Sequence, residues 1–276
     1  MQIKFFNMQG TGNQIMVVDE RNSNRPPPTA DQLRFLADPA TGPGFDSLMW
    51  VMPAKSDSAL ASYRVFNRDG GEVEQCGNGV RCVARLLAAD RSDNGAFALE
   101  SPAGIIEARI LPRDRVSVNM GQPEFRPEHI PFIAEQAANC YEIDVGGEQF
   151  EIRVVSMGNP HCVLLVDEPA TARVAELGPA LERHARFPRR TNVGFLGLCN
   201  RAELSLRVWE RGVGETLACG TGACAAMVVA RRAGWIDATA TVNLPGGQLV
   251  VSWPRAADSV WLTGAALMIS EGTIDL

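Results

Sequence analysis

The strongest constraint on the fold of this chain is a stretch of sequence that occurs twice, once in each half. Residues 66–80 (FNRDGGEVEQCGNGV) align without gaps with residues 209–223 (WERGVGETLACGTGA), and six of the 15 positions are identical. A second pair of similar segments, 12–20 and 158–168, precedes the first pair in each half and is separated by nearly the same number of residues. One copy in each half argues against a solenoid and predicts two similar domains related by a pseudo-twofold axis.

Each half combines short apolar runs, typical of strands, with one clear helix. We expect domains at residues 1–125 and 126–276, with a linker near Pro123–Pro131, and an α/β (α+β) fold. The strands are expected at 14–18, 63–66, 116–120, 161–166, 204–209 and 248–253. Helices are expected at Val80–Ala89 and Ala223–Ala233, where apolar residues recur at helical spacing. Each helix follows a Cys-Gly-x-Gly sequence, so Cys76 and Cys219 are each expected just ahead of a helix N-terminus.

Composition and charge exclude several classes of function. The chain has 276 residues, 46% of them hydrophobic, and a net charge of -6 with both signs interspersed, which disfavours nucleic-acid binding. No signal-peptide pattern and no long apolar run are present, so we expect a cytoplasmic protein with no membrane partner. Seven dispersed cysteines disfavour a disulfide framework. Three scattered histidines disfavour a metal site.

The two repeated cysteines suggest acid-base chemistry. A helix N-terminus carries unpaired N–H groups and a partial positive charge, which bind carboxylates and lower a thiol pKa. If the pseudo-twofold axis brings the two helix starts together, Cys76 and Cys219 face opposite sides of one carbon. One thiolate can then remove a proton while the other thiol donates one, which inverts a stereocentre.

The cation content favours a route without a cofactor. Pyridoxal phosphate, which many racemases use, requires a Schiff-base lysine, and the chain has only Lys4 and Lys55. Backbone N–H groups of the two helix starts are then the candidates that stabilise the substrate carboxylate as it becomes enolate-like. These groups belong to Gly77, Asn78, Gly220 and Thr221.

Five motifs together resemble the diaminopimelate epimerase family, in order and across nearly the whole chain. They are Cys76-Gly-Asn-Gly-Val-Arg-Cys82, Met157-Gly-Asn-Pro-His161, Thr191-Asn-Val193, Glu210-Arg-Gly212 and Ala218-Cys-Gly-Thr-Gly222. The resemblance implies two pseudosymmetric domains, each a mostly antiparallel sheet wrapped around a central helix. It also implies pyridoxal-independent interconversion of LL- and meso-diaminopimelate, a step toward lysine and peptidoglycan precursors, with Cys76 and Cys219 as the acid-base pair.

The resemblance further implies which residues bind the substrate and which assist the thiols. His161 and Glu210 resemble the residues that support the cysteines. The remaining substrate-binding positions implied are Asn13, Ser47, Asn67, Asn159, Asn192, Glu210 and Arg211. Two positions depart from the family pattern, which usually has an aliphatic residue at Pro43 and often Gln at Ser47, and this leaves the side-chain specificity open.

Other readings of the sequence remain. A proline or hydroxyproline racemase on the same fold is the closest alternative, and a thiol redox protein or a non-catalytic binding module would belong to other classes. We interpret Cys82, Cys140, Cys162, Cys199 and Cys224 as small packing residues and assign no role to His129 or His184. The expected partners are a small amino-acid substrate and, in solution, a second copy in a homodimer.

Overall fold

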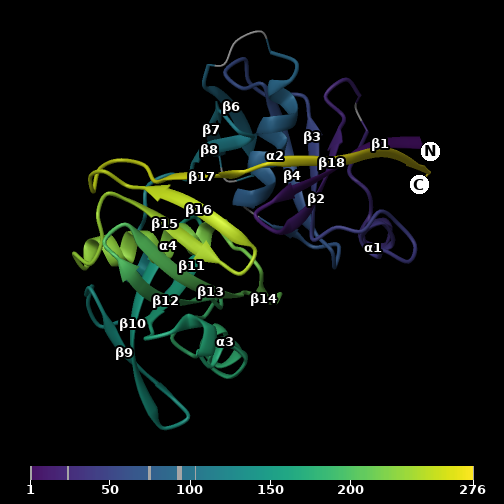
Figure 1. Cartoon of the computed structure of the whole chain (residues 1–276). Coiled ribbons are helices and arrows are strands. Elements are labelled where there is room, and N and C mark those ends of the chain that lie inside the picture. The colour runs from purple at the N-terminus through teal and green to yellow at the C-terminus, as the bar shows by residue number, and fades with distance from the viewer. Residues whose placement is uncertain (1, 24, 74–75, 92–94, 103, 276) are drawn as a thin grey trace. The chain divides into compact units, whose positions relative to one another are not determined.

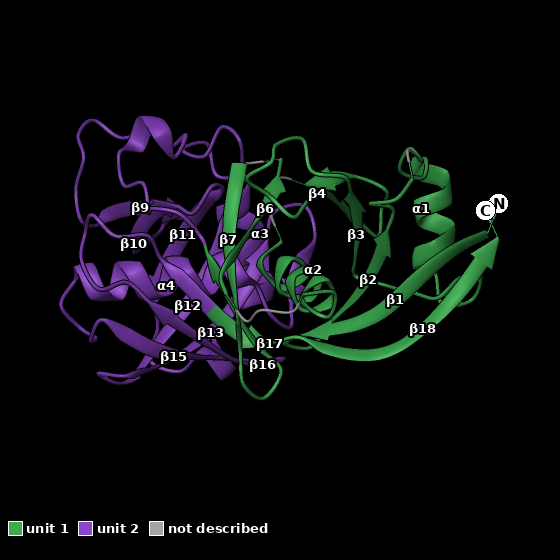
Figure 2. Cartoon of the chain, turned by 90° about the horizontal axis from the view of Figure 1, so that it is seen from above, with its two compact units in different colours: residues 1–119, 263–276 green, residues 120–262 purple. Residues whose placement is uncertain are grey.

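The structure is a computed structural model that describes residues 2–23, 25–73, 76–91, 95–102 and 104–275 (Figure 1). The chain forms two compact units, coloured separately in Figure 2. Unit 1 contains residues 1–119 and 263–276, and unit 2 contains residues 120–262. The first unit therefore uses both ends of the chain.

The described residues of unit 1 form two helices and a mixed set of strands. Its elements are β1 (Gln2–Gly10), β2 (Asn13–Asp19), α1 (Ala30–Ala37), β3 (Ser47–Met52), β4 (Ala61–Asn67), β5 (Glu72–Val73), α2 (Gly77–Ala88), β6 (Phe97–Ser101), β7 (Gly104–Leu111), β8 (Arg115–Asn119) and β18 (Leu267–Asp275). Strand β17 (Trp261–Ala265) begins in unit 2, ends in unit 1 and pairs with β8.

Unit 2 repeats this order of elements. Its elements are η1 (Pro127–His129), β9 (Tyr141–Val145), β10 (Glu148–Ser156), β11 (Pro160–Leu165), η2 (Pro169–Thr171), α3 (Val174–Glu182), β12 (Asn192–Asn200), β13 (Glu203–Glu210), β14 (Gly214–Thr216), α4 (Gly220–Arg232), β15 (Thr239–Leu244) and β16 (Gly247–Ser252).

The pairing of strands is the same in both units, which explains the internal repeat. In unit 1, β2 pairs antiparallel with β1 and parallel with β3, and β4 pairs antiparallel with β3 and β5 and parallel with β6. In unit 2, β11, β12, β13, β14 and β15 pair in the same pattern, starting from β10. Strand β18 pairs with β1 as β9 pairs with β10. Most of these pairings are antiparallel, as expected for this fold class.

One helix lies at the centre of each unit. Helix α2 packs against β1, β2, β3, β7 and β8, and α4 packs against β10, β11, β12, β13, β15 and β16. Every residue of α4 from Gly220 to Ala230 is buried, and its small alanine and glycine side chains let strands approach from several sides. A helix that is apolar all round must be surrounded by protein. The expected wrapping of a sheet around a helix is confirmed.

The six strands expected from the sequence match β2, β4, β8, β11, β13 and β16 to within two residues, whereas both expected helices start three residues late. Helix α2 begins at Gly77 and α4 at Gly220, directly after the cysteines. The first turns contain glycine, Asn78 and Thr221, which lack the apolar periodicity used for the prediction. In each first turn, the side chain of the preceding cysteine accepts a hydrogen bond from a backbone N–H that has no helical partner. This contact stabilises the start of the helix.

The division into units differs from the expected domains in two places. The boundary falls between residues 119 and 120, so the expected linker segment, Pro123–Pro131, lies inside unit 2, where Ile130 is fully buried. At the other end, residues 263–276 lie in unit 1 and not with the second half. The reason is the long antiparallel pairing of β18 with β1. Within the described part of the chain, no helix is long and apolar enough to cross a membrane.

Gly272 tests the contribution of the C-terminal strand to unit 1. A Cβ at this position would lie 2.7 Å from the Phe5 ring on the paired strand, so Gly272→Ala must displace a buried side chain. We expect unit 1 to lose about 1–3 kcal/mol of stability. Hydrogen exchange should quicken in β1 and β18 but not in α4. Thr273→Ala, an exposed change on the same strand, is the control, and equal exchange in both variants would contradict the expected packing.

Candidate active site

Each unit places one cysteine at the N-cap of its central helix. The Gly79 amide donates to Cys76 Sγ at 3.2 Å, and the Gly222 amide donates to Cys219 Sγ at 3.4 Å. Both cysteines have extended backbone, so the sulfur points back over the first helical turn. At Gly79 a Cβ would lie 2.3 Å from Met49 Sδ, so the glycine is required for this close packing. The repeated Cys-Gly-x-Gly sequence thus encodes a sulfur-capped helix.

Cys219 has a carboxylate partner. It is buried, and its Sγ donates to Glu210 Oε2 at 3.2 Å, while Thr216 donates to Glu210 Oε1 at 2.6 Å. Desolvation raises the pKa of Cys219 well above its usual value, and the nearby Glu210 charge raises it further. Glu210 as a whole is partly exposed to solvent, but its carboxyl group is desolvated by the surrounding protein. This desolvation raises the pKa of Glu210. Cys219 is therefore a thiol at rest, and it donates its hydrogen bond to the carboxyl group of Glu210.

A chain of polar side chains continues from the same helix start. Asn159 Nδ2 donates to Thr221 Oγ1 at 3.3 Å, and Asn159 Oδ1 lies 3.0 Å from His161 Nε2. Because an amide oxygen only accepts, this geometry assigns the imidazole hydrogen to Nε2. Burial, with a smaller effect from the positive charge of Arg211, lowers the pKa of His161 to about 3. His161 is therefore neutral at pH 7 and orients Asn159.

Asn192 connects β11, the strand that contains His161, to the turn after Glu210. It lies opposite His161 in the parallel pairing of β11 and β12. Its Nδ2 donates to the Pro160 carbonyl at 3.1 Å, and its Oδ1 accepts from the Arg211 amide at 2.9 Å. Seven of the residues singled out in the sequence are thus linked by contacts or register within unit 2. They are Asn159, His161, Asn192, Glu210, Arg211, Cys219 and Thr221.

Unit 1 brings together its own set of expected residues at the equivalent end of the sheet. Ser47, at the start of β3, is buried and lies opposite Asn67, at the end of β4. Asn13 starts β2 opposite Gly10, and a Cβ at Gly10 would lie 3.0 Å from the Asn78 carbonyl oxygen. These positions correspond to those around Cys219 in unit 2.

The two sets differ in their ionisable groups. In the repeat, Asn67 occupies the position of Glu210, and Ile15 occupies that of His161. At this position of the repeat, a carboxyl group lies beside Cys219, whereas the equivalent residue for Cys76 is an amide. Each cysteine nevertheless caps its helix in the same way. The units are alike in backbone and unlike in acid-base chemistry.

Two buried charged residues near these sites were missed from the sequence. Arg81, fully buried in α2, donates to the Gly77 carbonyl at 2.9 Å, to Asn78 Oδ1 at 2.8 Å and to Thr11 Oγ1 at 2.9 Å. It thereby fixes the side chain of Asn78. Glu182, at the end of α3, is 2% exposed and accepts from Gly212 and Trp209. A charged residue on the apolar face of each helix was the available signal.

The remaining cysteines divide into buried and exposed groups. Cys82, Cys162 and Cys224 are buried as expected, and burial raises the pKa of Cys82 to about 12. The interpretation as packing residues was wrong for Cys140 and Cys199, which are exposed. Cys140 directly precedes β9, and Cys199 lies in β12 next to its end at Asn200, where burial is incomplete.

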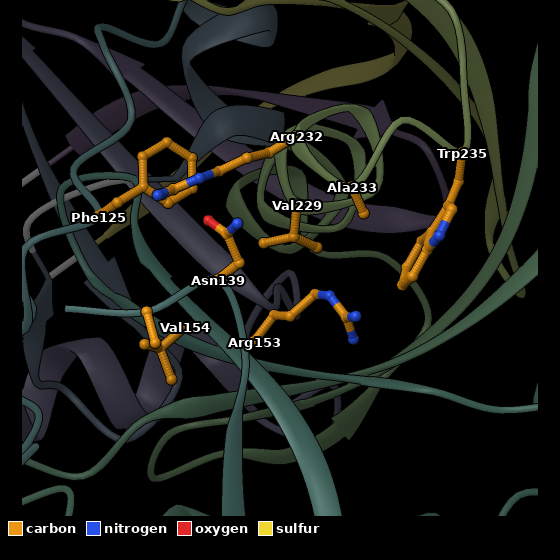
Figure 3. Close-up of a pocket in the computed structure, with 9 residues that line it drawn as sticks. Phe125, Asn139, Arg153, Val154, Val229, Arg232, Ala233 and Trp235 are labelled. Atoms are coloured by element: carbon orange, nitrogen blue, oxygen red, sulfur yellow. The ribbon is translucent and has the colours of Figure 1, made fainter. Parts of the chain in front are cut away.

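A separate hollow in unit 2 contains none of the expected site residues. This pocket, of about 220 Å³, is lined by Phe125, Ala138, Asn139, Arg153, Val154, Val229, Arg232, Ala233 and Trp235 (Figure 3). Arg232 stacks over Phe125 at 4.2 Å and Arg153 over Trp235 at 4.3 Å. The pocket lies at the C-terminal end of α4, whereas Cys219 is at the opposite end of the same helix.

The neutral state of His161 predicts how stability depends on pH. Its pKa is about 3 in the folded protein and about 6.5 when unfolded, so its contribution is present above pH 6.5 and is lost as the pH falls toward 3. Between pH 7 and pH 5 we expect a loss of about 2 kcal/mol from this residue. Urea unfolding of His161→Gln should show a smaller loss than the unmodified protein. His129→Gln, at an exposed histidine, should not, and identical pH dependence in all three proteins would contradict the assignment.

Comparison with known proteins identifies the family of the chain. The family model described as diaminopimelate epimerase matches residues 5–126 and 153–269. A protein named diaminopimelate epimerase from Ectopseudomonas mendocina is 47% identical over 279 aligned positions, which cover 100% of both chains. The matched ranges include Cys76, Cys219 and the polar residues described around them.

Solved structures share the fold at low sequence identity. A predicted epimerase from Pseudomonas aeruginosa is 18% identical with a TM-score of 0.72, covering 99% of each chain. A hydroxyproline epimerase from Agrobacterium vitis, solved with bound trans-4-hydroxy-L-proline, is 18% identical with a TM-score of 0.69, covering 99% of this chain and 92% of its own. These likenesses concern the fold, whereas the sequence match shows that the chain belongs to the diaminopimelate epimerase family.

Proposed function

We propose that this protein interconverts LL- and meso-diaminopimelate by proton transfer at Cα, with Cys76 and Cys219 as the two acid-base groups. The observation that carries the proposal is the thiol at the N-cap of the central helix in each unit, within a chain of the diaminopimelate epimerase family. Two thiols at equivalent helix caps suit a reaction whose forward and reverse directions use the same two steps.

The chemistry follows from what a helix start offers. One cysteine, as a thiolate, removes the α-proton, and the electron pair of the C–H bond moves toward the substrate carboxylate. Backbone N–H groups of Gly77, Asn78, Gly220 and Thr221 are suited to stabilise this charge, because the first turn of a helix has N–H groups without helical partners. The other cysteine, as a thiol, donates its proton to the opposite face of the carbon. The mechanism requires that both thiols reach the same carbon when the substrate is bound.

Glu210 is suited to control the protonation state of Cys219, the thiol of unit 2. Its carboxylate accepts a hydrogen bond from the Cys219 thiol, and burial raises the pKa of both groups. Cys219 is thus ready to act as the acid, and transfer of its proton to Glu210 would prepare it as the base for the opposite direction. Neutral His161 holds Asn159, which in turn binds the Thr221 hydroxyl beside the sulfur.

The lysines support a route without pyridoxal phosphate. Lys4 is exposed and paired with Glu271 at 3.0 Å, and Lys55 is also exposed. A Schiff-base lysine needs a desolvated setting, and neither of these exposed positions provides one. The polar groups of Asn13, Ser47, Asn67, Asn159, Asn192 and Arg211 would then bind the amino and carboxylate ends of the substrate directly. The cytoplasmic location and the homodimer remain predictions.

Deuterium exchange tests the reaction. Incubation of LL-diaminopimelate with the protein in heavy water should incorporate one deuterium at the inverted Cα, because the incoming proton comes from a thiol that exchanges with solvent. Mass spectrometry and chiral chromatography measure the label and the stereochemistry together. Inversion without label, or no inversion, would exclude the two-thiol reaction.

Replacement of either cysteine tests the division of roles. Cys76→Ala or Cys219→Ala removes the only proposed acid or base on one face, so kcat should fall by at least about 10³-fold in each. Cys199→Ala, at an exposed cysteine, is the matched control and should retain full activity. Substantial turnover by either first variant would refute the assignment.

The substrate's distal charges test the specificity. We expect kcat/KM for diaminopimelate to exceed that for proline, hydroxyproline, lysine or glutamate by about 10⁴-fold, because a polar pocket rejects ligands that leave its groups unpaired. Arg211→Met should reduce this preference, since an arginine is suited to bidentate carboxylate binding. Equal or better turnover of proline or hydroxyproline by the unmodified protein would favour a racemase of that type on the same fold.

A further inference from the structure

We propose that Glu182 is a positioning residue that holds the turn carrying Glu210 and Arg211, and so sets the contact between Glu210 and Cys219. The inference rests on the proposed function for its catalytic consequence, while its structural part concerns unit 2 alone. Glu182 and Gly178 lie four residues apart on one face of α3, and we call this pair the α3 clamp.

The carboxylate of Glu182 is committed to the turn. Its Oε1 accepts from the Gly212 amide at 3.0 Å, and its Oε2 accepts from Trp209 Nε1 at 2.9 Å. Trp209 and Gly212 flank Glu210 and Arg211 in the sequence, so one carboxylate fastens both sides of the pair. At 2% exposure these hydrogen bonds have little competition from water. Arg190 Nη1 lies 3.7 Å from Oε1 and supplies a positive charge.

Gly178 brings α3 close enough for these bonds to form. A Cβ at residue 178 would lie 2.7 Å from Trp209 Cγ and 2.9 Å from Trp209 Cβ. These atoms are at the rigid base of the side chain, so they cannot move aside as a flexible chain end would. The glycine therefore allows the helix backbone to rest against Trp209, and Glu182 then reaches the turn one helical turn later.

The backbone of Glu182 is also tied to the site. Its carbonyl accepts from the Thr191 amide at 3.3 Å, directly before Asn192, whose Oδ1 accepts from the Arg211 amide at 2.9 Å. Glu182 thus connects to the turn by its side chain and to the residue before Asn192 by its main chain. Both routes meet at the Glu210–Gly212 segment.

The clamp affects the distance between the Glu210 carboxylate and the Cys219 sulfur. This carboxylate lies at the end of β13, where strand pairing with the short β14 covers only three residues. The pairing of β13 with β12 reaches only to Trp209, and beyond it the Arg211 amide donates to Asn192 Oδ1. Without the clamp these contacts and the short β14 pairing hold the turn less firmly, and Glu210 would lose its fixed distance from the Cys219 sulfur. A displacement of about 1 Å in a catalytic group can lower a rate by about 10²-fold.

Glu182→Gln is the direct test. The amide keeps the size of the carboxylate but has only one acceptor oxygen for two N–H donors. We expect kcat/KM for diaminopimelate to fall by about 10²-fold. We also expect iodoacetamide to alkylate Cys219 about tenfold faster relative to Cys76, because a freed turn exposes the sulfur and removes the charge that raises its pKa. Peptide mass mapping measures both thiols in one sample, with Cys76 as the internal reference.

Three variants complete the test. Gly178→Ala should change both readouts in the same direction, because the added methyl group separates α3 from Trp209. Glu176→Gln, at an exposed residue of the same helix, should change neither. Val251→Ala, at a buried residue of β16, is the control for a general loss of stability, because β16 pairs with β15 and packs against α4. It should lower the melting temperature without altering the alkylation ratio.

The outcomes separate this inference from the proposed function. If the unmodified protein does not turn over diaminopimelate, the function fails, and the alkylation ratio alone decides the clamp. If Glu182→Gln leaves the ratio unchanged, or lowers kcat/KM no more than Val251→Ala does, the positioning role of Glu182 is refuted.

Discussion

The structure depends on the way each unit buries the N-terminus of a helix. A buried helix start leaves backbone N–H groups that must find acceptors, because an unpaired N–H away from water costs about 1–3 kcal/mol. In each unit a cysteine sulfur accepts one of these groups, while the neighbouring glycines keep the backbone close to its surroundings. The same arrangement that satisfies the fold leaves a cluster of N–H donors beside a thiol. Folding and chemistry thus share one piece of backbone.

Duplication has preserved this backbone while the side chains around it have diverged. Strand pairings, helix caps and the order of elements agree between the units, whereas Glu210 and His161 have no ionisable counterparts at Asn67 and Ile15. The segments around the two cysteines are therefore held by different types of charged group. In unit 1 buried Arg81 fixes Asn78 through a guanidinium, and in unit 2 Glu182 holds the turn through a carboxylate.

Much of this could be predicted because the relevant signals are local. The Cys-Gly-x-Gly repeat and the apolar runs predicted two similar halves, the central helix of each and a cysteine just ahead of each helix. The roles of Arg81 and Glu182 could not be predicted, because a buried charge depends on partners distant in sequence, such as Thr11 for Arg81 and Gly212 for Glu182. The place of β18 was missed for the same reason, since strand pairing across the length of the chain has no signature in either strand alone.

The return of the C-terminal strand has a consequence for synthesis. Residues 120–262 form an insertion within unit 1, so the ribosome completes the whole of unit 2 before β18 emerges. Until then β1 has only β2 beside it, and its other edge is open to any strand that passes. Domains generally fold as units during synthesis. The half encoded second can therefore reach its native state first, and the half encoded first is completed only after residues 263–276 have emerged.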